Sequence, residues 1–188
     1  MVVKQIIRVA FCSGLLLSAP QCRAQSDEVL QLINEVRERP NVFLQERLIP
    51  YLKENGMEGN SYAQSLVEEL KSAAKANALK TSPVLEKLAR DHAVDMGDHG
   101  KVGHESSNGT TFVERLRKKI KTGLIAENCD YGHATPLDIV MALLIDDGIS
   151  SLGHRKNLMS PVLKWIGIAI EKHKTYRINC VMDFASVM

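Results

Sequence analysis

The chain has 188 residues, of which 45% are hydrophobic, and a formal net charge of +2. This length suits one domain with an adequate core, and no linker, repeat or low-complexity tract divides the chain. The near-neutral charge argues against a nucleic-acid-binding protein. The one basic patch, residues 115–121, is predicted to be the solvated face of a helix.

The first 24 residues predict a secretory signal peptide. Lys4 and Arg8 give a basic start, residues 9–19 are mostly apolar, and Ala24 is a small residue at the expected cleavage position. The apolar run is too short to cross a bilayer, which argues against an anchor. We therefore expect a secreted or periplasmic protein with no membrane span. Its single domain, residues 25–188, would hold 21 basic and 22 acidic residues.

Apolar residues at helical spacing predict two helices in the first half of the chain. Ser26 can cap the first helix, which is expected to stop before Pro40. The second helix is predicted over residues 62–74. The glycines and asparagines of residues 54–60 predict a loop between the two helices.

Hydroxyl side chains mark the starts of three further helices. Ser82 precedes Pro83 at the start of a helix whose buried stripe includes His92, which we interpret as a core histidine. Thr110 is expected to cap a shorter helix. Thr135, followed by a proline and an acidic residue in the first turn, predicts another.

Three short strands are predicted over residues 124–129, 166–171 and 176–184, and the last two form a hairpin. Antiparallel strands with helices before and between them predict an α+β fold. In this fold, helices cover a small antiparallel sheet on both faces. Cys129 and Cys180 lie in predicted strands and would be the two cysteines left after cleavage. An exported protein favours a disulfide between them, with two buried free thiols as the alternative.

Short motifs in the second half of the chain resemble those of a known family. They are Leu88–Met96, Gly103-His104, Ala126-Glu127-Asn128, Gly153–Pro161 and Ile166-Gly167-Ile168. Together, their order and spacing resemble the CAP superfamily, the SCP/PR-1-like domain of cysteine-rich secretory proteins, antigen 5 and plant pathogenesis-related proteins. The resemblance begins near Leu32 and ends at Phe184, and it implies an α–β–α sandwich.

The resemblance also implies a cleft built from two histidines and two acids. His104 and His154 match the family's histidines, and Glu127 matches one glutamate. The second glutamate is missing, and Asp146, with Asp147 as a rival, is the best match for it. Two imidazoles and a carboxylate can hold a divalent metal such as zinc, transfer protons or form a buried polar network. A zinc ion held by the two histidines would need water to complete four ligands.

Two functions follow from these residues. The resemblance implies a secreted, non-enzymatic binding or effector module whose partner is a small ligand, a lipid or sterol, or an extracellular protein. Local chemistry allows instead a metal-dependent hydrolase in which His104 and His154 hold the metal and Glu127 is the general base. The sequence contains neither a His-Glu-x-x-His helix nor a Gly-x-Ser-x-Gly elbow. The binding module is therefore the favoured interpretation.

Overall fold

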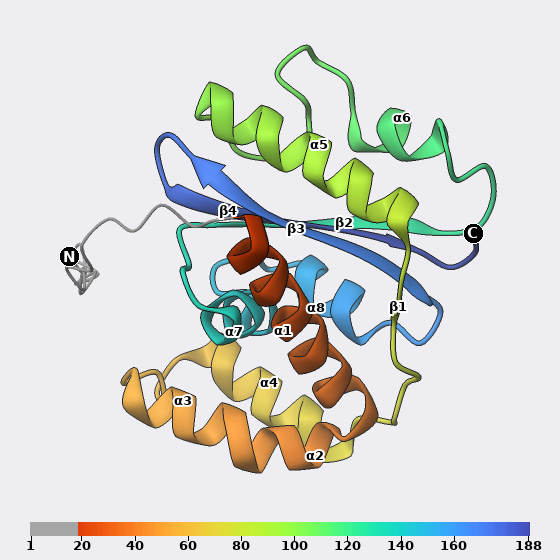
Figure 1. Ribbon diagram of the computed structural model, residues 1–188. Coiled ribbons are helices and arrows are strands. Elements are labelled where there is room, and N and C mark those ends of the chain that lie inside the picture. The colour runs from red at the N-terminus through yellow and green to blue at the C-terminus, as the bar shows by residue number, and fades with distance from the viewer. Residues whose placement is uncertain (1–18) are drawn as a thin grey trace.

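A four-stranded sheet separates two layers of helices in the computed structural model, which describes residues 19–188, with side chains from Cys22 on (Figure 1). Across the sheet the strands are β1 (Lys80–Thr81), β3 (Trp165–His173), β4 (Arg177–Ala185) and β2 (Ile125–Tyr131). β3 and β4 form the predicted hairpin, and β2 pairs antiparallel with β4. The α+β sandwich is confirmed. The two-residue β1 pairs parallel with β3 and makes the sheet mixed.

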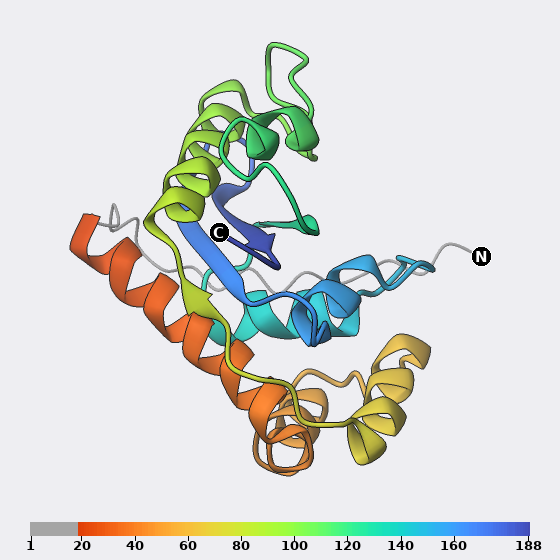
Figure 2. The same cartoon turned by 90° about the vertical axis from the view of Figure 1, so that its right-hand side faces the viewer.

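The helices form two unequal layers. They are α1 (Ala19–Glu38), α2 (Pro40–Phe43), the π-helical turn η1 (Leu44–Leu48), α3 (Ile49–Glu54), α4 (Ser61–Ser72), α5 (Pro83–His99), α6 (Phe112–Arg117), α7 (Pro136–Ile145) and α8 (Gly153–Met159). Helices α5 and α6 lie on one face of the sheet, and α1, α7 and α8 lie on the other, with α2 to α4 packed outside them (Figures 1 and 2).

Alternation along the strands divides the core. In β4, Cys180, Met182 and Phe184 join the large apolar cluster that includes α1, α4 and α7. Val181 points to the other face and packs with Ala89 of α5. Successive strand residues face opposite sides of a sheet, so the pairing register fixes which side chains share a face.

Local capping signals predicted some helix starts and missed others. Ser82 and Thr135 cap α5 and α7 as predicted. The cap of α6 is Thr111, one residue beyond the predicted Thr110, and it forms a capping box with Glu114. Ser26 is not a cap, because α1 begins upstream and the Ser26 hydroxyl donates to a carbonyl one turn earlier.

The predicted disulfide between Cys129 and Cys180 is wrong. Both residues lie in strands of one sheet, as expected, but both are free thiols. Cys129 pairs with Val181 across the sheet and faces α5, whereas Cys180 pairs with Asp130 and faces the α1 layer. A disulfide needs Cβ atoms that point toward each other, and the sheet itself separates these two side chains.

The predicted signal peptide lies mostly outside the described residues, since residues 1–18 are not described and α1 begins at Ala19. Among the helices of residues 19–188, none combines the length and the apolar character needed to cross a membrane.

Candidate functional site

The candidate site lies at β2, an edge strand of the sheet. Glu127 of β2 pairs with Asp183 of β4. Asp183 is two residues from Val181, which packs on α5, so Asp183 and Glu127 both face the α5 layer. The next residue, Asn128, faces the other layer, where its amide donates to the carbonyl of His154 at 3.1 Å. Side chains from both faces of the sheet can therefore meet around this one strand.

His104 is held against Glu127 on the α5 side. Its Nδ1 lies 2.9 Å from Glu127 Oε1, and Arg115 donates to the other carboxylate oxygen. Arg115 also donates to the His104 carbonyl at 2.8 Å, which fixes the backbone of this loop. The preceding Gly103 has φ +108°, a conformation that favours glycine. The Glu127 side chain is 1% exposed, whereas that of His104 is 49% exposed.

His154 is held against Asp146 on the opposite side. Its Nδ1 lies 2.7 Å from Asp146 Oδ1, and its backbone N–H donates to the other carboxylate oxygen at 3.0 Å. Asp146 ends α7 in a left-handed conformation that aspartate tolerates. Its buried carboxylate accepts the backbone hydrogen bond of His154 at the start of α8, where a negative charge is favoured. Asp147 is exposed. The sequence left open whether Asp146 or Asp147 replaces the second glutamate of the family, and the residue that lies beside His154 is Asp146.

The structure brings all four predicted cleft residues together as two histidine–carboxylate pairs. The ring centroids of His104 and His154 are 6.5 Å apart, with an interplanar angle of 37°. Asn157 donates to Asn128, so the two asparagines brace the loop that carries His154. Each imidazole uses Nδ1 for its carboxylate, which leaves Nε2 as the atom for a ligand.

Residues 30–184 match the model of the CAP family, described as the cysteine-rich secretory protein family. The chain belongs to this family. A search of curated proteins gave no match.

Three of the solved structures that are similar to this CAP domain come from bacteria. An outer surface protein of Borrelia burgdorferi has a TM-score of 0.51 and 23% identity over 68% of this chain and 90% of its own. An extracellular Bacillus anthracis protein with an SCP domain has a TM-score of 0.52 and 18% identity over 92% of this chain and 45% of its own. A cysteine-rich secretory protein of Staphylococcus aureus has a TM-score of 0.53 and 14% identity over 90% of this chain and 40% of its own. These likenesses concern the fold alone, and the chain spans less than half the length of the last two proteins.

Glu127 is poorly placed to act as a general base. Burial raises its pKa, but the hydrogen bond from His104 and the charge of Arg115 outweigh burial and hold the pKa below its ordinary value. Both carboxylate oxygens are already hydrogen-bonded. This geometry suits a carboxylate that orients an imidazole in the CAP cleft better than one that accepts a proton from water.

Asp183 is a buried acid in this CAP domain that the sequence analysis did not single out. It pairs directly with Glu127 across β4 and β2 and is 0% exposed. Neither carboxylate oxygen meets a hydrogen-bond donor among the described residues. Burial raises the pKa of Asp183 well above its usual range, and the negative charge of Glu127 raises it further. Its proximity to Glu127 depends on strand register, which no local pattern reveals.

Replacing Asp183 with asparagine is expected to stabilise the protein increasingly as pH rises from about 4. The unfolded aspartate loses its proton near this pH, whereas the folded one retains it, so wild-type stability falls until the folded pKa is passed. Each unit of raised pKa contributes about 1.4 kcal/mol to this fall. Urea unfolding of both proteins from pH 4 to 8, with a chelator present, measures the difference. A difference independent of pH would contradict a neutral Asp183.

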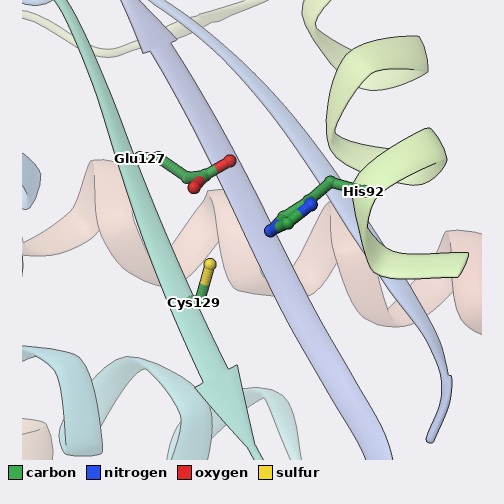
Figure 3. A group of neighbouring side chains, drawn as sticks. All are labelled: His92, Glu127 and Cys129. Carbon is green, nitrogen blue, oxygen red and sulfur yellow. The ribbon is translucent and has the colours of Figure 1, made fainter. Parts of the chain in front are cut away.

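A second group of side chains lies beside the histidine–carboxylate pairs. Glu127 and Cys129 project from β2 to one side, and the imidazole of His92 reaches from α5 toward them (Figure 3). The prediction that His92 is buried is confirmed, but its ring is only half satisfied. Nε2 lies 3.0 Å from the Gly103 carbonyl, while Nδ1 is buried without a hydrogen-bond partner in the described part of the chain. Burial raises the pKa of the Cys129 thiol well above its usual range.

Proposed function

We propose that this CAP domain is a secreted, non-enzymatic binding or effector module whose cleft binds a divalent metal such as zinc through His104 and His154. The observation that carries the proposal is the paired support of the two imidazoles. Each Nδ1 is hydrogen-bonded to a carboxylate whose side chain is 1% exposed, at 2.9 Å in one pair and 2.7 Å in the other.

This arrangement is typical of metal-binding histidines. A carboxylate at one ring nitrogen fixes the tautomer and ring orientation, and it makes the other nitrogen a better ligand. Metal ligation needs the neutral imidazole, so affinity should depend on pH. Two protein ligands leave room for water or for a group on a partner molecule to complete the coordination. A bound metal would supply a positive centre that anionic or carbonyl groups of a partner can bind.

The alternative, a metal-dependent hydrolase, has weaker support. It needs a free base beside the metal, and Glu127 already accepts hydrogen bonds from His104 and Arg115. Asp146 is similarly engaged by the side chain and backbone of His154. With both carboxylates committed to orienting imidazoles, the binding role is the better supported one.

Secretion is supported by the signal-like residues 1–24 and by the extracellular or outer-surface similar structures. A lipid or sterol ligand has only the family resemblance behind it. One surface hollow of about 350 Å³ is lined by Ser61, Tyr62, Ser65, Ser150 and Leu152. Another, of about 280 Å³, is lined largely by charged residues. We therefore base the proposal on the metal.

Replacing His154 with alanine is expected to weaken zinc binding at the cleft by at least about tenfold, because one of two protein ligands is lost. Asp146→Asn should weaken it by roughly 10- to 100-fold while leaving both ligands in place. In the wild type, affinity should fall as the solution is made more acidic, because only a neutral imidazole binds a metal. Calorimetric titration of purified protein with zinc measures all three effects.

His99→Ala is the matched control for this experiment. His99 is half-exposed at the end of α5, and its ring pairs with Asp95 and with none of the four cleft residues. Its loss should leave zinc affinity unchanged. Equal zinc affinity in wild type and His154→Ala would remove the cleft histidines from the metal site and with them the proposed function.

A further inference from the structure

Three potential metal ligands converge on the sheet face beneath α5. One atom each from His92, Glu127 and Cys129 can be chosen so that all three lie within 4.8 Å of one another. Figure 3 shows a ring nitrogen of His92 pointing between the Glu127 carboxylate and the Cys129 sulfur. β2 brings the last two to one side because they are two positions apart in a strand, and α5 supplies the third.

We propose that His92, Glu127 and Cys129 form a thiolate-containing site for a thiophilic divalent cation such as Zn²⁺, distinct from the His104–His154 pair. This inference goes beyond the proposed function. The site formed by His92, Glu127 and Cys129 is called the inner site. It uses a different histidine from the His104–His154 pair, and it alone contains sulfur. The two sites share Glu127, which lies between them.

The observed spacing is close to that of a filled site. Zinc bonds nitrogen and oxygen at about 2.0–2.2 Å and sulfur at about 2.3 Å, so tetrahedral ligand atoms lie roughly 3.4–3.6 Å apart. The three atoms lie at most 4.8 Å apart, so drawing them together requires side-chain movements of about 1 Å or less. The Gly103 carbonyl oxygen, 3.0 Å from His92 Nε2 and 3.7 Å from Cys129 Sγ, offers a fourth ligand.

A buried acid beside the trio also favours a cation. Asp183, next to Glu127, is fully buried, and neither of its carboxyl oxygens meets a donor among residues 22–188. Arg115 donates to Glu127 and not to Asp183. A dication with a Cys129 thiolate adds one net positive charge beside the buried Glu127 carboxylate and the Asp183 carboxyl group.

Binding at this site involves a defined proton change. Cys129 releases its thiol proton to solvent when its sulfur bonds the cation, since the thiolate is the metal ligand. The neutral His92 imidazole keeps its proton on the nitrogen that does not ligate. Glu127 keeps its hydrogen bonds with His104 through Oε1 and with Arg115 through Oε2, and a remaining lone pair of Oε1 bonds the cation. Cation binding should therefore release one proton and strengthen as pH rises.

Cobalt(II) titration of the purified, chelator-stripped protein under anaerobic, reducing conditions tests this site. A cobalt–thiolate bond gives a charge-transfer band in the near ultraviolet, which cobalt bound by imidazole and carboxylate alone does not give. Wild type should bind one equivalent of cobalt with this band, and zinc should displace it. Cys129→Ser should abolish the band, whereas His154→Ala should retain it at full intensity.

Cys180→Ser is the matched control, because Cys180 is a buried thiol in the same sheet that faces the opposite layer. It should keep the band, and circular dichroism of both serine variants checks that they remain folded. Cobalt binding without a thiolate band in the wild type, or an unchanged band in Cys129→Ser, would overturn the inner site. If the wild type shows the band but binds no second equivalent of cobalt without sulfur, the result would count against the metal at His104 and His154. The two proposals therefore fail separately.

Discussion

Replacing Arg37 with methionine is expected to lower the free energy of unfolding by about 3–5 kcal/mol. Arg37 lies in α1 and is 1% exposed. Its guanidinium donates to four backbone carbonyls, those of Asn77, Leu158, Ser160 and Leu163, at 2.6–3.2 Å. Methionine keeps an unbranched apolar stem but is shorter and donates to none of them, so buried acceptors lose their partners.

The consequences of this change should reach the cleft. Two of the four carbonyls, those of Leu158 and Ser160, lie at the end of α8 or just beyond it. His154 is the second residue of the same helix. Chemical denaturation of Arg37→Met measures the stability loss, and zinc titration shows whether the cleft is loosened as well.

Arg39→Met is the control for this prediction, because Arg39 is exposed and makes no side-chain cap at α2. The same substitution there should change stability by no more than about 0.5 kcal/mol. Similar losses in the two variants would mean that the carbonyl contacts of Arg37 contribute little.

Replacing Gly167 with alanine should destabilise the protein by about 3 kcal/mol, because α5 lies directly against β3 at this residue. A Cβ atom on Gly167 would lie 2.1 Å from both the Glu86 nitrogen and the Leu85 carbonyl carbon. Both are backbone atoms in the first turn of α5, so no side-chain rotation can relieve the overlap. The helix must move off the sheet or the strand must bend.

Gly97 makes the matching approach near the other end of α5, where a Cβ atom would lie 2.0 Å from the Lys172 carbonyl oxygen. Together the two glycines allow α5 to lie along β3, which places His92 over β2. The Gly167→Ala change should therefore also weaken the cobalt–thiolate band of the inner site, because it displaces α5.

Gly59→Ala provides the comparison for the glycine prediction. No atom outside its immediate neighbours lies within 4 Å of a Cβ added at Gly59, and its φ is not in the left-handed region. Alanine there should leave the midpoint of thermal unfolding nearly unchanged. If Gly167→Ala unfolds at the wild-type temperature, the close packing of α5 on β3 is not a constraint on the fold.

The sequence alone determined the elements whose signals are local. Ser82 and Thr135 each cap a helix through a hydrogen bond from the backbone three residues on, so a short window of sequence contains the whole interaction. Two short strand-forming runs separated by a short turn predicted the β3–β4 hairpin for the same reason. The ordered motifs then predicted the family and its cleft residues, and the family model confirms the family.

Tertiary structure decided everything that depends on strand register and layer packing. Cys129 and Cys180 were both correctly placed in strands, yet only the pairing of β2 with β4 shows that they face opposite layers. The same register sets Asp183 beside Glu127, and the position of α5 on the sheet brings His92 to Cys129. Such contacts join residues tens of positions apart, and their geometry comes from the packing of whole elements rather than from the pattern within any one of them.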